Sequence, residues 1–264
     1  LGANHGGEIS LGANMTSLAF SLSRAFARLF QPGDEVVITQ LDHEGNRGPW
    51  LALREKGIIV REVRLLPEGR LDYEDFESKI NERTRLVAVG FSSNILGTVN
   101  DLKKIRYLSH QVGAWLLVDA VHGAPHFSLD VKALDCDFLL CSAYKFYGPH
   151  VGILYAREGL LDRLPTDRLR TAGQAAPDSI ETGTPNFAAY AGVSAAVNFL
   201  ESQGLGQTKR ERLVRAMEMI HEHEMGLFIK LYRGLEAMEG IQLWGLPPDI
   251  IDRAPTLSFS VLNE

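Results

Sequence analysis

The feature that most constrains the fold is a series of short apolar runs separated by stretches of helical character. Several runs are nearly continuous Val, Ile and Leu, as expected for strands buried on both faces of a parallel sheet. The strand-like runs cover 35–40, 57–65, 85–91, 114–120, 136–143 and 152–156. Helical stretches at 15–30, 46–57, 72–81 and 101–113 lie between many of them. This alternation predicts an α/β fold, a mostly parallel sheet flanked by helices, with its ligand site beyond the carboxyl ends of the strands.

The pattern changes after about residue 186. Two long helices are expected at 188–204 and 208–240, followed by strands at 241–246 and 255–262. We therefore predict a large domain over 1–205, and a connecting helix with the start of an incomplete C-terminal α+β domain over 206–264. The chain begins with Leu1 and stops within a strand-like run, so we expect a fragment of a longer protein.

Charge and composition exclude several classes of protein. A net charge of −6 argues against general nucleic-acid binding, and no apolar run approaches the length that spans a membrane. No signal-peptide pattern opens the chain. The two cysteines, Cys136 and Cys141, are too few for a disulfide framework, which favours a reducing, cytoplasmic compartment. We expect both to be small buried hydrophobic residues, neither metal ligands nor nucleophiles.

A lysine in apolar company marks the candidate site. Lys145 lies in "CSAYKFYGPH", between aromatic residues and just after a predicted buried strand. An ammonium group is costly to bury without a partner. A partly desolvated lysine becomes a nucleophilic amine, suited to Schiff bases with carbonyl substrates or with pyridoxal phosphate.

Polar residues stand at the ends of other predicted elements, and each has an ordinary structural interpretation. Asp119 ends a strand, where an acid often caps a turn. A nucleotide-binding role would need a G-x-G-x-x-G or G-x-x-x-x-G-K-[ST] loop, and the sequence has neither. The 14–16 stretch opens a helix, where N-capping is the simplest role. His43 and the 92–94 stretch follow strands in loop-like sequence.

Metal binding is not predicted. The side chains of the "DHE" stretch diverge, and Pro125 interrupts any helical pairing of His122 with His126.

Taken together, these residues match the needs of pyridoxal phosphate. The cofactor requires an amine for its aldehyde, an anion for its ring nitrogen, donors for its phosphate and a flat contact for its ring. Lys145, Asp119, the 14–16 helix start and His43 supply one each. Asp119 would keep the ring nitrogen protonated, and Lys145, once released by a substrate amine, would move protons as base and acid.

The chain also resembles a known family. The stretch "LLVDAVHGAPHFSLDVKALDCDFLLCSAYKFYGPHVGILYAR" resembles the cofactor-lysine region of class V aminotransferases, especially the cysteine desulfurase-like branch. "LDHEGNRGPW", "SSNILGTVNDL" and "ETGTPNFAAYAGVSAA" resemble the same family in the same order. The resemblance implies the large domain of a fold type I pyridoxal-phosphate-dependent transferase, a small amino-acid substrate, and a homodimer whose sites use both subunits.

The resemblance assigns residues one by one. Lys145 matches the Schiff-base lysine, Asp119 the ring-nitrogen partner and His43 the stacked histidine. The remaining cofactor contacts that it implies are Asn14, Met15, Thr16, Asn94, His122, Ser142, Tyr144 and Thr184, the last reaching the partner subunit's phosphate. Three of these positions depart from the family: His122 replaces a glutamine, Tyr144 a histidine and Met15 a hydroxyl residue.

The leading hypothesis is a pyridoxal-phosphate-dependent enzyme acting on a small amino acid, by C–S cleavage or amino transfer. Desulfurase, selenocysteine lyase and transaminase activities all stay open, because the family's persulfide cysteine and carboxylate-binding arginine would follow residue 264. We expect this stretch alone to be inactive. Two alternatives are a catalytically silent cofactor-binding or dimerisation module and a nucleotide-binding α/β domain.

Overall fold

The protein is built on one seven-stranded sheet. The computed structural model describes residues 1–249 and 253–262. The strand order is β1-β7-β6-β5-β4-β2-β3. Strands β2 to β6 pair in parallel, whereas β7 is antiparallel to both β6 and β1. Their bounds are β1 (Ile9–Gly12), β2 (Glu35–Thr39), β3 (Ile59–Val63), β4 (Thr84–Gly90), β5 (Trp115–Asp119), β6 (Phe138–Ser142) and β7 (Gly152–Ala156). The predicted, mostly parallel sheet is confirmed.

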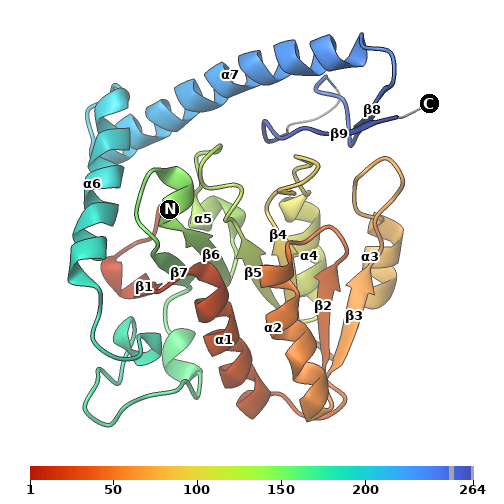
Figure 1. Cartoon of the computed structure of the whole chain (residues 1–264). Helices are drawn as coiled ribbons and strands as arrows, with labels where there is room; N and C mark the ends of the chain where they lie inside the picture. Colours follow the sequence, from red (N-terminus) through yellow and green to blue (C-terminus); the bar gives the residue numbers. More distant parts are fainter. Residues whose placement is uncertain (250–252, 263–264) are drawn as a thin grey trace.

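Helices cover both faces of this sheet (Figure 1). One layer holds α1 (Met15–Leu29) and α2 (Gly48–Leu51). The other holds α3 (Tyr73–Lys79), α4 (Leu102–Gln111) and α5 (Val131–Leu134). Strand β5 alternates between the layers: Leu117 packs in the α1 core, and Leu116 and Val118 pack in the α4 core. Both sides of the strand are therefore apolar, which explains its continuous hydrophobic run.

The predicted helix over 46–57 is not continuous. The region folds as two 3₁₀ turns, Glu44–Asn46 and Ala52–Lys56, on either side of the four-residue α2. Pro49 lies in the first turn of α2, where its missing N–H is tolerated, and Gly57 ends the second turn in a left-handed conformation (φ 77°). Pro49 prevents a continuous helix from running through its position, and Gly57 ends the segment. The region therefore forms short turns in place of the single predicted helix.

The predicted helix over 101–113 is confirmed as α4. The side chain of Asp101 caps its start by accepting the Lys104 N–H (3.0 Å), and Gly113 follows its end with φ 72°. Both terminal signals in the sequence therefore act as expected.

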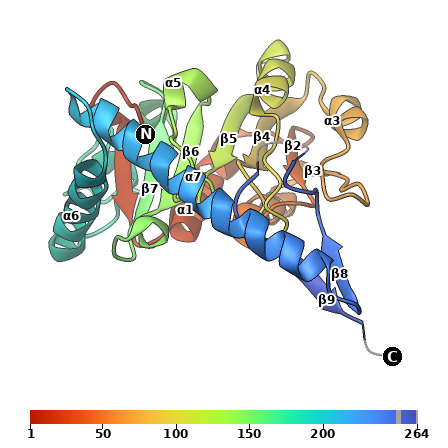
Figure 2. The ribbon, with the colours of Figure 1, turned by 90° about the horizontal axis from the view of Figure 1, so that it is seen from above.

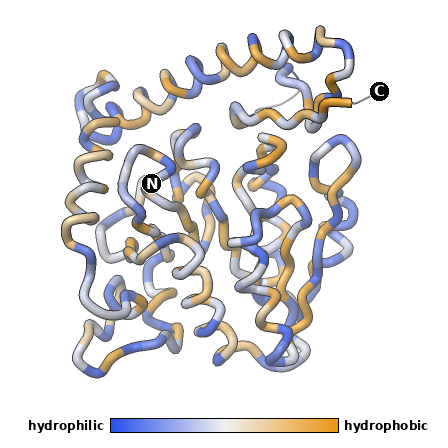
Figure 3. The backbone as a smooth tube through the Cα atoms, viewed as in Figure 1, coloured by the Kyte–Doolittle hydropathy of each residue, from blue (hydrophilic) through white to orange (hydrophobic). Residues whose placement is uncertain are grey.

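Two long helices carry the chain away from the sheet. Helix α6 (Phe187–Gln203) lies along one edge of the molecule, and α7 (Lys209–Glu236) crosses the end of the sheet (Figures 1 and 2). Apolar and polar residues alternate along α7 (Figure 3). Beyond α7, β8 (Ile241–Trp244) and β9 (Ser258–Val261) form a separate antiparallel pair. The division into domains at 205/206 stays a prediction.

A segment near the C-terminus, 253–258, docks on the loop after β4. Its side chains and main chain donate hydrogen bonds to main-chain carbonyl groups of residues 95–97. The pairs are Arg253 Nη2 with Leu96 (2.7 Å), the Ala254 N–H with Gly97 (2.8 Å), and Ser258 Oγ with Ile95 (2.6 Å). Arg253 is fully buried, with its guanidinium over the Phe228 ring of α7. The segment therefore joins α7 and the β8–β9 pair to the main sheet.

The close approach of α1 to β7 generates a stability prediction. A Cβ atom on Gly152 would lie 2.3 Å from the Asn14 carbonyl carbon. We expect Gly152→Ala to lower the free energy of unfolding by about 1–3 kcal/mol, because the backbone must shift to relieve the clash. Urea denaturation measures the change. The control is Gly226→Ala in the exposed middle of α7, where nothing lies within 4 Å and alanine should leave stability unchanged or raise it by up to about 1 kcal/mol. Equal stability of the two variants would contradict the prediction.

Candidate active site

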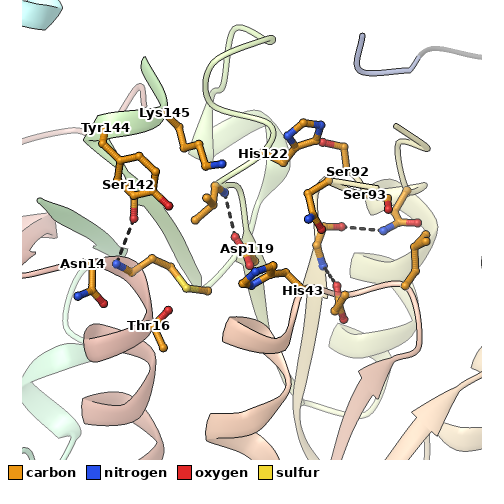
Figure 4. Close-up of a pocket in the computed structure, with 17 residues that line it drawn as sticks. Asn14, Thr16, His43, Ser92, Ser93, Asp119, His122, Ser142, Tyr144 and Lys145 are labelled. Atoms are coloured by element: carbon orange, nitrogen blue, oxygen red, sulfur yellow. Dashed lines mark hydrogen bonds between the residues drawn. The ribbon is translucent and has the colours of Figure 1, made fainter. Parts of the chain in front are cut away.

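One pocket lies where the parallel strands end (Figure 4). It is bounded by the residues that follow β2, β4, β5 and β6, and by the N-terminus of α1. Its walls include all but one of the residues assigned from the sequence: Asn14, Met15, Thr16, His43, Asn94, Asp119, His122, Ser142, Tyr144 and Lys145. The exception, Thr184, lines a second cavity beside the start of α6.

Asp119 is the last residue of β5, and only 7% of its surface is exposed. One carboxylate oxygen, Oδ1, accepts the Val121 N–H (2.9 Å). Burial raises the pKa of Asp119 to about 6, against the opposing effects of this hydrogen bond and of His43. The carboxylate thus carries its charge at neutral pH at a cost, which a cationic group bound beside it would offset.

The start of α1 contributes backbone and hydroxyl groups. Asn14 is the N-cap: its side chain accepts the Ser17 N–H (2.9 Å), and Ser17 Oγ accepts the Asn14 N–H (3.2 Å). The Met15 N–H donates to Ser142 Oγ (3.1 Å). Capping, the simpler of the two interpretations of Asn14, is therefore its structural role. Within the described part of the chain, the Thr16 N–H and hydroxyl have no hydrogen-bond partner, which leaves both for an anion.

His43 presents its ring at the end of β2. Its Nδ1 accepts the Gly45 N–H (2.9 Å), so the neutral ring carries its proton on Nε2. Figure 4 shows the ring beside Asp119 on the floor of the pocket. Gly45 leaves room for this arrangement, because a Cβ there would lie 3.0 Å from Thr16 Oγ1 and 3.1 Å from His43 Nδ1.

Asp42 also lines the pocket, although no role was assigned to it from the sequence. Its carboxylate accepts hydrogen bonds from the Thr39 hydroxyl (2.9 Å), the Thr39 N–H (3.2 Å) and the Gly90 N–H. These bonds tie the end of β2 to the end of β4. Burial raises the pKa of Asp42 to about 7 in spite of them. The only signal in the sequence was an acid three residues after a strand-ending threonine, which is common in turns.

The loop after β4 adds polar groups that lack partners. Ser92, Ser93 and Asn94 all line the pocket, and so does Asn100, which the sequence did not single out. Asn100 Nδ2 donates to the Gly90 carbonyl (2.7 Å). In the described ranges, Ser92 Oγ and Asn100 Oδ1 are buried without a hydrogen bond. Buried polar atoms are costly to leave unpaired, so this wall suits a polar ligand.

Lys145 reaches the pocket but is not buried, and the expectation of a desolvated ammonium is wrong for this chain by itself. Its side chain is exposed, as are Tyr144 (40%) and Tyr147 (63%), and only Phe146 points into the core. The 3₁₀ turn Ala143–Phe146 causes this, because its three-residue period turns Tyr144 and Lys145 outward. Lys145 Nζ lies 5.4 Å from the centre of the Tyr144 ring. Tyr147 closes the turn with φ 68°, a strained value for a residue other than glycine.

His122 lies on the rim of the pocket near Lys145 (Figure 4). Burial, together with the nearby His126 and Lys145, lowers the pKa of His122 to about 4. The imidazole is therefore uncharged at neutral pH. Its Nε2 lies 2.7 Å from the hydroxyl of Thr256.

The two cysteines are buried, as predicted. Cys136 and Cys141 are at most 1% exposed, and burial raises the pKa of each thiol to about 12. Both remain thiols at neutral pH, and neither lines this pocket.

The described residues include no group of three or more potential metal ligands, and none of their helices has the length and apolar character needed to cross a bilayer.

Solved structures share this architecture. The cysteine desulfurase CsdA from Escherichia coli superposes with a TM-score of 0.85 at 26% identity, covering 98% of this chain and 64% of that one. A cysteine desulfurase from Thermococcus onnurineus gives a TM-score of 0.84 at 28% identity, covering 96% and 63%. The fold is that of the fold type I pyridoxal-phosphate-dependent enzymes, as predicted.

Sequence comparison defines the family. The family model described as aminotransferase class-V matches residues 12–263, and the chain belongs to this family. A probable cysteine desulfurase of Synechocystis is 36% identical over 244 residues, or 87% of this chain and 55% of the relative. A cysteine desulfurase of Escherichia coli K12 is 36% identical over 227 residues, or 81% and 53%. The chain thus spans about half the length of these curated relatives.

The raised pKa of Asp119 predicts that replacing its carboxylate by a group that cannot ionise stabilises the folded protein by an amount that depends on pH. From about pH 4 to about pH 6 the folded protein holds this proton more tightly than the unfolded chain, so the carboxylate lowers the free energy of unfolding as pH rises. Asp119→Asn keeps an acceptor for Val121 but cannot ionise. We expect the ligand-free variant to be more stable than wild type by about 2–3 kcal/mol near pH 8 and by less than about 1 kcal/mol near pH 4.

Urea denaturation at the two pH values tests this. Glu55→Gln, at an exposed acid with no hydrogen bond or salt bridge among the described residues, is the control and should change stability by less than about 0.5 kcal/mol at either pH. A difference for Asp119→Asn that did not change with pH would contradict the prediction.

Proposed function

We propose that the full-length protein is a pyridoxal-phosphate-dependent enzyme that acts on a small amino acid, by C–S cleavage or amino transfer. The observation that carries the proposal is that Lys145 and the buried Asp119 line one pocket with the start of α1. Membership of the aminotransferase class-V family supports it, because the family depends on this cofactor. The relatives named cysteine desulfurase favour C–S cleavage.

The pocket fits the cofactor on its own chemistry. Asp119 is a buried carboxylate that a protonated ring nitrogen would stabilise. Thr16 and Ser142 offer a backbone N–H and hydroxyl groups to the phosphate, and His43 offers a flat ring to the pyridine. The unpaired Ser92 and Asn100 atoms provide further polar contacts. When bound, pyridoxal phosphate supplies an electron sink for the bonds at the substrate Cα.

Lys145 has two tasks in this proposal. With pyridoxal phosphate bound, the Lys145 amine would hold the cofactor through its aldehyde, and the same amine would move a proton at the substrate Cα. Exposure of the side chain lets an aldehyde reach it. The strained turn at Tyr147 fixes the backbone from which it projects.

This stretch of chain does not supply every group that C–S cleavage needs. A sulfur carrier requires an accessible thiolate, and Cys136 and Cys141 are buried thiols. We therefore assign the carrier cysteine and the arginine for the substrate carboxylate to the remainder of the full-length protein. The 264-residue stretch alone is expected to be inactive.

A second subunit fits the exposed side of α6. Residues 187–200 of this helix include no charged side chain, yet Ala196 and Leu200 are its only buried residues, while Phe187 is 69% and Phe199 53% exposed. The Phe199 ring meets the edge of Tyr147, two residues after Lys145. We propose a homodimer through this face, which places the partner near the lysine turn and lets Thr184, just before α6, reach the partner's site.

The covalent bond to Lys145 is the first test. We expect borohydride reduction of the full-length protein with pyridoxal phosphate to leave the cofactor on the peptide that contains Lys145, because reduction makes the lysine bond permanent. Peptide mapping by mass spectrometry locates it. Lys145→Arg should abolish the label, and Lys132→Arg, at an exposed lysine on α5, should keep it. A label elsewhere, or binding without a label, would remove the mechanism.

Turnover by the full-length protein identifies the reaction. We expect cysteine to yield alanine, with its sulfur held as a persulfide on an enzyme cysteine and released as sulfide only when a thiol reductant is added, because the relatives are desulfurases. Selenocysteine in place of cysteine tests for a lyase, and keto-acid formation tests for a transaminase. If Lys145 is labelled but no amino acid is turned over, the proposed enzymatic activity is wrong and the protein is a catalytically silent cofactor-binding module.

The subunit arrangement predicts a dimer that depends on α6. Sedimentation of the full-length protein should show a two-chain species, and Phe199→Asp should shift it toward single chains, because a charge in an apolar interface is costly. Glu218→Lys, an exposed change of charge on α7, is the control. A dimer unaffected by Phe199→Asp would place the interface elsewhere.

A further inference from the structure

A chain of side chains leads from the pocket to the connecting helix α7. His122 lies at the pocket rim, and the His126 ring packs edge-on against it, with 5.0 Å between ring centres and 72° between planes. Nδ1 of His126 lies 2.8 Å from Oε2 of Glu224, in the middle of α7. Both partners of this contact are mostly buried, with side chains 17% and 28% exposed. A hydrogen bond to a carboxylate in such surroundings is stronger than one between neutral groups.

A second contact fixes the other side of the His122 ring. Its Nε2 bonds to the hydroxyl of Thr256, in the segment that docks on the loop after β4. Nδ1 is then the ring nitrogen left for a ligand in the pocket. The orientation of Nδ1 depends on two groups far away in sequence, Thr256 and, through His126, Glu224.

The turn between the two histidines makes such support necessary. Pro125 lies between them, and the loop is held by main-chain bonds from the Ala124 N–H to Ala120 and from the Phe127 N–H to Gly123. No helix or strand spans this loop. Neighbouring elements must therefore set the direction of the ring.

Other functions for this cluster are less suited to its geometry. A metal site would need at least three converging ligands, and residues 1–249 and 253–262 contain no such group. The titratable groups that act on His122 are His126 and Lys145, and with burial they keep it uncharged at neutral pH. An uncharged ring acts by the placement of one donor or acceptor, so its orientation decides what it can bind.

We propose that Glu224 is a positioning residue of the active site: by accepting the His126 N–H it holds the edge-on contact that directs His122 toward the bound cofactor. The proposal rests on the proposed function for the identity of that ligand. The contacts among Glu224, His126 and His122 stand without it.

The test compares Glu224→Ala, Glu224→Gln and Glu222→Ala in the full-length protein. Glu222 is exposed on the same helix and controls for loss of an acid. The first readout is the ring resonances of His122 in ligand-free, histidine-labelled protein, assigned with His122→Gln. The second is the affinity for pyridoxal phosphate. We expect Glu224→Ala to shift the His122 resonances and weaken cofactor binding about three- to tenfold, the value of one hydrogen bond.

The glutamine variant separates positioning from charge and from folding. Its amide oxygen can still accept the His126 N–H, so we expect it to restore most of the resonance positions and affinity. Unshifted His122 resonances in Glu224→Ala, equal shifts in Glu222→Ala, or a glutamine variant no better than alanine would each overturn the proposal. If Glu224→Ala does not fold, His126→Gln takes its place with the same expected shifts. Failure of the wild type to bind pyridoxal phosphate would overturn the proposed function, and the resonance comparison would still decide the role of Glu224.

Discussion

The site depends on the contact between the first turn of α1 and the start of β7. Residue 152 has no side chain, and this lets the Asn14 carbonyl lie where a Cβ atom would otherwise be. The contact brings the Met15 N–H to Ser142 Oγ, three residues before the lysine. The start of α1, the end of β6 and the start of β7 therefore lie close together, and the other residues of the pocket are arranged around them.

Much of this arrangement could be predicted from the sequence because it follows from strand ends. Asp119 and Lys145 each follow an apolar run, and parallel strands bring such positions to one edge of a sheet. The exposure of Lys145 could not be predicted, since the local sequence does not determine which side chains of a 3₁₀ turn face solvent. The contacts of Thr256 and Glu224 with the 122–126 loop could not be predicted either, because the residues in contact are 134 and 98 positions apart in the sequence.

Burial in the ligand-free pocket disfavours a negative charge on Asp119 and a positive charge on His122. The same desolvation raises the pKa of Asp119 and lowers that of His122, so each group is pushed toward its neutral form. Such an environment raises the energetic value of any complementary charge that enters. The burial of Asp119 therefore lowers the stability of the free protein and at the same time favours the binding of a ligand that brings a cation to this carboxylate. Such a trade-off is common at functional sites.

The docking of segment 253–258 has a consequence for how the pocket can change. Its bonds to the loop after β4 end on the main-chain carbonyl groups of 95–97, which every amino acid possesses. Gly97 is constrained, since a Cβ there would lie 2.6 Å from the Ala254 oxygen. The side chain of Asn94, which is exposed and lines the pocket, is therefore free to vary without releasing the segment. Anchoring and recognition use different atoms of one loop, so mutation can retune what the pocket accepts while the attachment of α7 stays intact.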